Sequence, residues 1–351
     1  MRQSCSPVEV TLIDPTREAA WDRLVASHAE STFFHRAAWA SVICQTYGHQ
    51  AAYIHCSEGD KTVALIPMIE VSSVLTGRRG VCLPFTDVCG PLVFGNADRG
   101  LVMNVVSDLA RQRRWKYFEL RGSEALPESA TPAVTFHGHS LDLRRSTDQL
   151  LASFSSSVRR AIRKAERSGL KVEISRTEQA VAHFYRLHVQ TRKRHGLPPQ
   201  PFSFFRNLHE HAIDAGLGFV VVATIQSRLA AAALFLTSGK TAIYKFGASD
   251  ENLQEHRGAN LVMWEAIKFL AQNGCETLHF GRTSAANAGL RRFKLGWGTK
   301  ERAVEYFRFD AQVARWSSAQ DRASGLHNKI FGSLPRALNR LAGAMIYPHL
   351  D

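Results

Sequence analysis

The sequence predicts a mixed α/β protein made of two consecutive domains of one plan, each a largely antiparallel sheet flanked by helices. Three observations support this prediction. The chain has 351 residues, more than one hydrophobic core usually supports. Its second half shows the order strand, two helices, three strands, helix, strand, short helix, strand. Its first half repeats that order more loosely, and repetition of an element order indicates duplication of a fold. Two unrelated α/β domains are the alternative.

The second half contains the clearer patterns. Residues 153–169 (SFSSSVRRAIRKAERSG) predict a helix with serine caps at its start and a glycine at its end. Residues 170–175 alternate as in a strand. A long helix is expected from Thr177 to Gly196, because the prolines of LPPQP cannot continue it. Residues 202–216 predict the next helix.

Three strand-like runs joined by short polar turns follow, as in an antiparallel meander: 217–225, 229–237 and 241–249. Residues 257–274 predict a helix. Residues 276–281 (ETLHFG) predict a buried strand, and 303–309 the last strand.

In the first half, apolar patterns predict strands at 8–13, 50–57, 61–71, 77–85 and 115–122, with helices at 17–29, 33–48 and 99–113. The closest internal similarity lies between RRWKYFELRGS and NGCETLHFGRTS. In each, a helix end leads into an apolar strand that ends in Arg-Gly or Gly-Arg. We therefore expect domains at 1–150 and 151–312. The remainder, 313–351, is expected to be a basic amphipathic helical tail.

Composition narrows the class of function. The net charge of +13 indicates anionic partners such as nucleic acid, phosphosugars or an anionic membrane surface. Between Arg159 and Arg194 there are eleven Lys and Arg residues against three glutamates. The six scattered cysteines show no CxxC spacing and no metal pattern, so we expect reduced thiols and no metal. No apolar run is long enough to span a membrane.

The stretch FGRTSAANAGLRRFKLGWGTKE, residues 280–301, follows the buried strand. It combines glycines, which permit close backbone approach, with arginines and aromatic rings. Cations beside aromatic rings suit an anionic, partly apolar ligand. A solvated turn followed by a basic helix end is the alternative interpretation.

The chain resembles the FemAB-like branch of the GCN5-related N-acetyltransferase (GNAT) superfamily, often labelled BioF-like acetyltransferase domains. The resemblance covers residues from about 30 to 310. It rests on FFHRAAW with YGHQ, SSSVRRAIRKAERSGL, RKRHGLPPQPFSFF and FGRTSAANAGLRRFKLGWG. It implies a tandem GNAT fold and a transferase. The better-known members move an aminoacyl group from charged tRNA to an amine of a peptidoglycan precursor, and others are associated with exopolysaccharide or cell-wall biogenesis.

The resemblance implies a catalytic residue. Transfer of an acyl group to an amine forms a tetrahedral oxyanion, which needs a cation or amide donors. Lys294 in RRFK matches the lysine thought to hold the acyl carbonyl in the Fem ligases. From the sequence we expect Lys294→Met to reduce turnover about a hundredfold with little change in melting temperature. Candidate substrate-binding residues are Arg282, Arg292, Phe293, Trp297, Tyr244, Arg159, Arg163 and Arg194.

The donor stays open between aminoacyl-tRNA and acyl-CoA, and no tightly bound cofactor is expected. GNAT enzymes that bind acyl-CoA hold its pyrophosphate on a loop at a helix start. The corresponding residues here are QEHRGAN, and the candidates are Arg257, Gly258 and Asn260. Glu255 stands where an Arg or Gln is usual, which predicts weak acetyl-CoA binding. Several Fem ligases carry a long helical-hairpin insertion, and this sequence has no long heptad run that would predict one.

From these observations we expect a cytoplasmic enzyme that acylates an amine of an anionic nucleotide- or lipid-linked saccharide or peptidoglycan precursor. One alternative is an acetyl-CoA-dependent N-acetyltransferase of a small or sugar amine. Another is a non-catalytic GNAT pair that binds an anionic ligand or RNA. The tail predicts a helix with Leu334, Leu338, Leu341 and Met345 on one stripe. It either packs on its own domain or attaches to the inner face of an anionic membrane.

Overall fold

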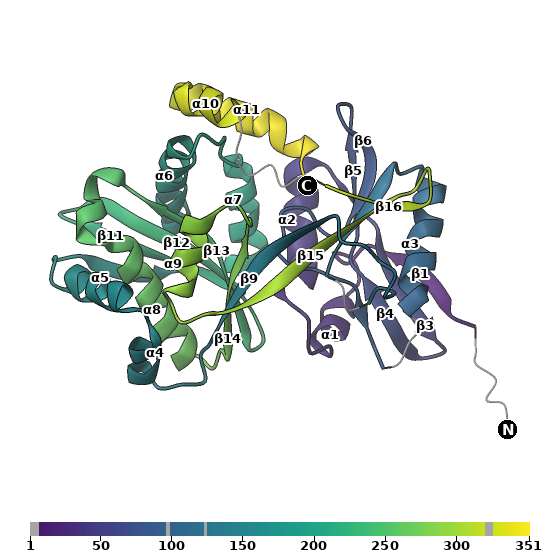
Figure 1. The fold of residues 1–351 in the computed structure, drawn as a ribbon, viewed down its shortest axis with the longest axis horizontal. Helices are drawn as coiled ribbons and strands as arrows, with labels where there is room; N and C mark the ends of the chain where they lie inside the picture. Colours follow the sequence, from purple (N-terminus) through teal and green to yellow (C-terminus); the bar gives the residue numbers. More distant parts are fainter. Residues whose placement is uncertain (1–6, 96–98, 123–124, 320–325) are drawn as a thin grey trace. The chain divides into compact units, whose positions relative to one another are not determined.

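The computed structural model describes residues 7–95, 99–122, 125–319 and 326–351. The chain forms two compact units. The N-terminal unit comprises residues 1–136, 304–321 and 347–351, and the C-terminal unit comprises 137–303 and 322–346. Both are mixed layers of sheet and helix, as Figure 1 shows.

The unit boundaries differ from the predicted 1–150, 151–312 and 313–351 because strand pairing assigns the segments. The second part of β9 (Val134–Asp142) pairs with β14 (Thr277–Thr283) of the C-terminal unit. The second part of β15 (Lys300–Asp310) pairs with β8 (Tyr117–Arg121) of the N-terminal unit. Neither long-range pairing leaves a local signal in the sequence.

The N-terminal unit holds two groups of strands. One has the order β1-β3-β4-β7, and the other contains β15, β8, β6, β5 and β2 in that order, with β16 paired to β15. The bounds are β1 Glu9–Ile13, β2 Gln50–Ala51, β3 Tyr53–Glu58, β4 Lys61–Ile66, β5 Ile69–Ser73, β6 Gly77–Val81, β7 Leu92–Val93 and β16 Arg315–Ser317. The run predicted as one strand at 61–71 is two strands, separated at Pro67 and Met68.

Its helices are α1 Trp21–Ala26, η1 Phe33–His35, α2 Ala37–Tyr47 and α3 Arg99–Arg113. The predicted helix at 33–48 is divided at Arg36, which adopts an extended conformation. Gly48 ends α2 in the left-handed region, at φ +70°, as a C-terminal glycine should. Val102, Val106 and Leu109 of α3 are buried in the core of this unit.

The C-terminal unit contains one run of strands in the order β10-β11-β12-β13-β14-β9. The new bounds are β10 Lys171–Ser175, β11 Gly218–Ile225, β12 Arg228–Ser238 and β13 Thr241–Ser249. The predicted meander is confirmed, since β11, β12 and β13 pair antiparallel. β13 and β14 pair in parallel over only three residues each, 241–243 with 277–279, although β13 continues to Ser249.

Helices cover both faces of these strands. They are α4 Thr147–Ser153, α5 Ser156–Glu166, α6 Glu178–Arg194, α7 Phe202–Leu208, the π-helical segment η2 His209–Ile213, η3 Glu251–His256, α8 Gly258–Gln272 and α9 Ala288–Leu295. Alternate residues of β11 (Phe219, Val221 and Ala223) share a core with α5 and α8. Figure 1 shows α6 on the opposite face.

Capping explains where two of these helices begin. The Ser155 hydroxyl accepts a hydrogen bond from the amide of Val158, and the Thr177 hydroxyl accepts one from the amide of Ala180. The sequence predicted a helix start at Thr177 and caps among the serines of residues 153–157. Sequence reasoning missed α4, although Ser146 and Gln149 form a capping box there.

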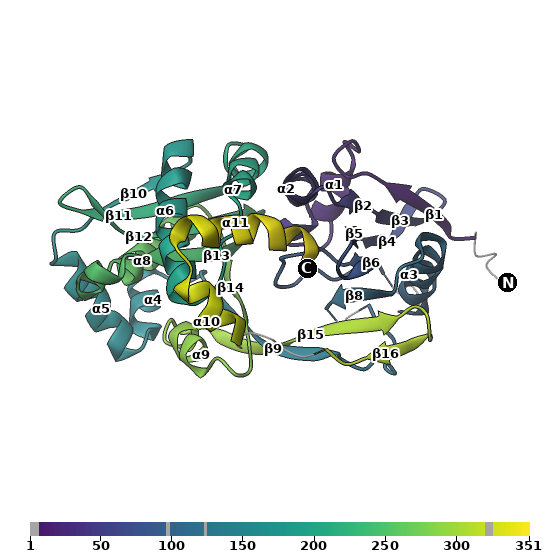
Figure 2. The same ribbon diagram turned by 90° about the horizontal axis from the view of Figure 1, so that it is seen from above.

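The tail forms two helices, because Pro335 interrupts the predicted single helix. α10 spans Leu326–Ser333 and α11 spans Arg336–Ile346, followed by the 3₁₀ turn η4 Tyr347–His349. Figure 2 shows α10 and α11 lying over α6. None of the helices within the described residues is long and apolar enough to cross a bilayer.

Candidate active site

The end of β14 departs from regular strand pairing, which leaves backbone groups free to bind side chains. Its register against β9 shifts between His279 and Arg282, and Gly281 lies in the left-handed region at φ +69°. A bulge of this kind disrupts the ladder and takes backbone groups out of their regular pairing. A glycine suits the position because other residues adopt this conformation at a cost.

Lys294 on α9 binds this irregular segment. Its ammonium group donates hydrogen bonds to the backbone carbonyls of Gly281 (3.0 Å) and Arg282 (2.9 Å), and the residue is only 3% exposed. α9 itself begins at the Asn287 cap, whose side chain accepts from the amide of Leu290 at 3.0 Å. Lys294 therefore joins α9 to the carboxyl end of β14 and places a buried positive charge there.

A carboxylate with three basic neighbours lies close by. Arg291 donates two hydrogen bonds to Glu301, both at 2.7 Å. Nε2 of His139 lies 3.0 Å from Glu301 Oε2, and Nδ1 of His137 lies 3.4 Å from Oε1. The hydrogen bonds from Arg291 lower the pKa of Glu301. Burial, and then the charge of Lys294, lower the pKa of His139, so its imidazole is neutral near pH 7.

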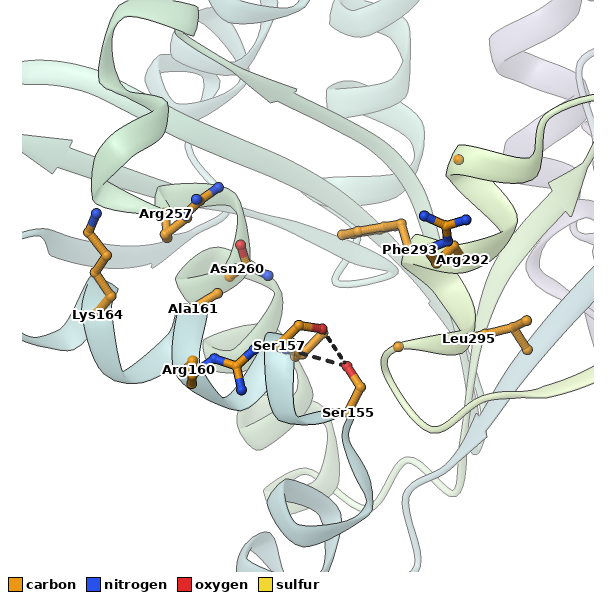
Figure 3. A pocket seen from close by; sticks show the side chains of 13 residues that line it. Ser155, Ser157, Arg160, Ala161, Lys164, Arg257, Asn260, Arg292, Phe293 and Leu295 are labelled. Carbon is orange, nitrogen blue, oxygen red and sulfur yellow. Dashed lines mark hydrogen bonds between the residues drawn. The ribbon is translucent and has the colours of Figure 1, made fainter.

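A cavity of about 840 Å³ opens between α5, the start of α8, and α9. Figure 3 shows side chains from these three helices around it. The lining residues are Ser155, Ser157, Val158, Arg160, Ala161, Lys164, Arg257, Asn260, Gly289, Arg292, Phe293, Leu295 and Gly296. The volume is of the size usual for small-molecule and cofactor sites.

The electrostatics of the cavity favour an anion. Four lining residues are cations (Arg160, Lys164, Arg257 and Arg292), and no Asp or Glu lines it. α8 also starts here, and its N-cap residue Arg257 makes no side-chain cap hydrogen bond. An uncapped helix start presents backbone amides and the positive end of the helix dipole to an anionic group.

Part of the wall is apolar. Val158 and Ala161 of α5 and Phe293 and Leu295 of α9 line the same cavity as the four cations. Arginine and lysine side chains hold phosphate groups, while apolar walls exclude water from a neighbouring carbon chain. The cavity therefore suits a ligand that is anionic at one end and partly apolar elsewhere.

The fold brings four of the predicted site residues together. Arg257 and Asn260 come from the QEHRGAN motif, and Arg292 and Phe293 come from GLRRFK; all four line the cavity. The two motifs are separated along the chain, yet they meet because α8 and α9 flank β14. Lys294 is not among the lining residues.

Three further predicted site residues, Trp297, Tyr244 and Gly258, pack in the protein interior. Trp297 is fully buried and packs edge-on against Phe154, with ring centroids 5.1 Å apart. The ring of Tyr244 packs against Phe280, and burial raises the pKa of Tyr244 to about 12. Gly258 is buried as the first residue of α8, and a Cβ there would lie 3.3 Å from Ala231.

The remaining predicted arginines lie outside the lining. Arg159 donates to the carbonyl of Ala152 at 3.1 Å, and Arg163 is exposed on α5. Arg194, at the end of α6, is exposed and donates to the carbonyl of Ser249 at 3.4 Å. The carbonyl of Arg282 accepts the hydrogen bond from Lys294.

From the sequence, Arg159, Arg160, Arg163 and Lys164 were all candidates to contact a polyanion, but Arg159 and Arg163 were the ones predicted as site residues, whereas Arg160 and Lys164 line the cavity. Ser157, Arg160 and Lys164 follow helical spacing and share the α5 face that lines the cavity. Helical periodicity could have separated them from Arg159 and Arg163. His139 and Glu301 were missed because only strand register brings β9 and β15 residues beside α9.

The position of Glu255 changes one expectation. Its side chain is 75% exposed, lies 3.6 Å from His256, and is not part of the cavity lining. Arg257, two residues later, takes the place at the start of α8. The acidic residue therefore lies outside the cavity wall, and its effect on a pyrophosphate there is weakened because solvent screens an exposed charge.

Comparisons with known proteins agree on the fold. Residues 152–308 match the family model described as "Acetyltransferase (GNAT) domain". The chain as a whole has a FemAB-like tandem GNAT fold, which confirms the resemblance inferred from the sequence.

Three solved structures illustrate the likeness of fold. The crystal structure of FemX superposes with a TM-score of 0.67 at 15% identity, covering 85% of this chain and 96% of that one. A tandem GNAT protein from the clavulanic acid biosynthesis pathway gives 0.54 at 9% identity, covering 87% and 99%. L-PGS from Bacillus licheniformis gives 0.54 at 11% identity, covering 94% and 98%. No curated protein matches the sequence.

Proposed function

We propose that the protein is an N-acyltransferase whose acyl donor carries phosphate groups that bind in the cavity between α5, α8 and α9. One observation carries the proposal: four cations and no carboxylate line a cavity at the uncapped start of α8. Aminoacyl-tRNA and acyl-CoA both offer phosphates next to an adenosine, so this cavity suits the chemistry that the two donors share.

The acyl end of the donor is proposed to lie toward the carboxyl end of β14. β13 and β14 pair only at their beginnings, so their later residues are not tied to each other by a ladder. The irregular segment of β14 and the buried charge of Lys294 lie at that end. A donor held by its phosphates at α8 would place its reactive carbonyl in this region.

The reaction forms one bond and breaks one. The acceptor amine attacks the acyl carbonyl, a C–N bond forms, and the C–O bond of an ester or the C–S bond of a thioester breaks. The leaving oxygen or sulfur takes up a proton while the amine loses one. Lys294 is our candidate for the charge that stabilises the oxyanion, which requires its ammonium group to lie within hydrogen-bond distance of that oxygen in the complex.

The acceptor is proposed to be an amine on an anionic saccharide or peptidoglycan precursor of the cell envelope. Support for the acceptor comes from the FemAB-like motifs and from the excess of positive charge. The protein is proposed to act in the cytoplasm, where nucleotide-linked precursors are made.

The experiment is a binding and turnover comparison. Calorimetry with CoA, and filter binding with aminoacyl-tRNA, would be repeated with the double variant Arg160→Ala/Lys164→Ala and with Arg163→Ala as a matched control on the same helix. We expect the double variant to bind the true donor at least tenfold more weakly and the control to bind normally. Failure of both donors to bind the wild-type protein would overturn the proposal.

A second candidate is an acetyl-CoA-dependent N-acetyltransferase of a small or sugar amine. The exposure of Glu255 and the position of Arg257 in the cavity favour it, because both remove an obstacle to pyrophosphate binding. Micromolar binding of acetyl-CoA together with release of CoA in the presence of an amine would select this candidate. Binding of tRNA without any acyl transfer would instead favour a non-catalytic RNA-binding protein.

A further inference from the structure

The tail helices α10 and α11 pack on the C-terminal unit through small and polar residues. Asn339 is fully buried, and its side-chain amide donates to the carbonyl of Leu197 at 3.3 Å. Gly343, one turn later, approaches Pro199 so closely that a Cβ would lie 2.0 Å from the Pro199 carbonyl oxygen. On α10, Gly332 lies close to Gly196. These contacts fix which side of α11 faces the protein.

Four large apolar side chains of the same helices face outward. Leu338, Leu341 and Met345 are 51%, 57% and 65% exposed, and Ile330 of α10 is 60% exposed. Residues 338, 341 and 345 are spaced as neighbours on one helical face. An amphipathic helix usually buries such a face, whereas this one buries Asn339 and Gly343. The exposed face therefore has no partner among the described residues.

The charge of the surroundings indicates what covers this face. Residues 326–350 contain Lys329, Arg336 and Arg340 but no Asp or Glu. The last turn of α6, with Arg192, Lys193 and Arg194, lies beside α10. Exposed apolar side chains within a purely cationic segment match the interface of an anionic bilayer, which takes up the apolar residues and attracts the cations.

A second copy of the chain fits less well. Two copies that met through this face would each present the same cations and no carboxylate, so like charges would face one another. We propose that α10 and α11 form a docking surface for an anionic lipid membrane, with Ile330, Leu338, Leu341 and Met345 inserted among the acyl chains. The helices lie in the plane of the interface and do not cross it.

The test is co-sedimentation of the full chain with vesicles. Vesicles of phosphatidylcholine mixed with phosphatidylglycerol are expected to bind the wild-type protein, and vesicles of phosphatidylcholine alone to bind it at least tenfold more weakly. Leu338→Ser/Leu341→Ser is expected to lose at least tenfold in partitioning onto the mixed vesicles. Val74→Ser/Leu75→Ser removes two other exposed apolar side chains, 96% and 76% exposed, and should bind as the wild type does.

The charge contribution is tested separately with Lys329→Gln/Arg336→Gln, which should bind several-fold more weakly at low salt and resemble the wild type at high salt. The substituted residues are exposed, so the melting temperature should stay within a few degrees. Absence of wild-type binding to the mixed vesicles would overturn the proposal. So would a wild-type dimer in sedimentation velocity that Leu338→Ser/Leu341→Ser dissociates, since the face would then belong to a second copy.

Discussion

The ammonium group of Lys294 donates a hydrogen bond to the backbone carbonyl of Gly281 at 3.0 Å and so ties α9 to the bulge of β14. A second hydrogen bond, to the carbonyl of Arg282 at 2.9 Å, completes the tie. The residue expected to act on the substrate thus also has a structural contact. A substitution of Lys294 is therefore expected to change both turnover and stability.

For Lys294→Met we expect turnover to fall about a hundredfold, because one oxyanion donor is lost. We also expect the free energy of unfolding to fall by about 1–3 kcal/mol, because two partly buried carbonyls lose their partner. This second effect replaces the expectation from sequence that the melting temperature would hardly change. Single-turnover rates at saturating donor and thermal melts measure the two effects separately. A destabilised variant with full turnover would leave Lys294 a purely structural role.

For Arg292→Ala we expect donor affinity to fall roughly tenfold, about 1.4 kcal/mol, because a charged hydrogen-bond donor leaves the cavity wall. Turnover at saturating donor should change little. The logarithm of the dissociation constant should also depend less steeply on salt concentration, since fewer phosphate contacts remain. Arg167→Ala, at the end of α5 and outside the cavity lining, is the matched control. Equal losses in both variants would show only a general effect of net charge.

We expect protonation of His35 to make the free energy of unfolding depend on pH. Burial lowers its pKa from 6.5 to about 4. Nδ1 of His35 accepts a hydrogen bond from the amide of Thr32 at 3.0 Å, and Nε2 lies 2.9 Å from the carbonyl of Gly90, so the neutral form with its proton on Nε2 fits both. Protonation of Nδ1 would break the contact with Thr32.

Because the folded pKa is the lower one, the unfolded chain binds the proton more tightly. The contribution to stability is therefore complete above pH 6.5 and is lost as the pH falls toward 4, by roughly 3 kcal/mol in all. Chemical denaturation at several pH values measures the slope. His35→Gln should flatten it in this window, and an unchanged slope would assign the acid sensitivity to other groups such as His188, whose pKa burial lowers to about 3.

Two glycines of the tail should respond oppositely to alanine. Gly343→Ala places a Cβ 2.0 Å from the Pro199 carbonyl oxygen, so α11 must shift, and we expect a loss of about 1–3 kcal/mol in stability. At Gly332 the nearest atom to a new Cβ is 3.6 Å away, so Gly332→Ala should be neutral or slightly stabilising through helix propensity. Thermal melts of both variants provide the comparison. Equal melting temperatures would show that α11 is not held through Gly343.

Much of the fold followed from local patterns in the sequence. The sequence predicted a serine-capped start for α5, the start of α6 at Thr177 and the meander from β11 to β13, because capping and burial periodicity act within a few residues. It also predicted the motif around α9. The same periodicity correctly placed Leu338, Leu341 and Met345 on one stripe. It could not tell whether that stripe faces the protein or the solvent.

The tertiary structure alone decided which residues meet. The cavity combines α5, the start of α8, and α9, which come together only because each packs on the strands of the C-terminal unit. The register of β9 brings His139 to Glu301, and the bulge of β14 brings two carbonyls to Lys294. Local propensity encodes elements because its forces are short in range along the chain. Contacts between distant residues depend on strand register and helix packing, which no short stretch of sequence contains.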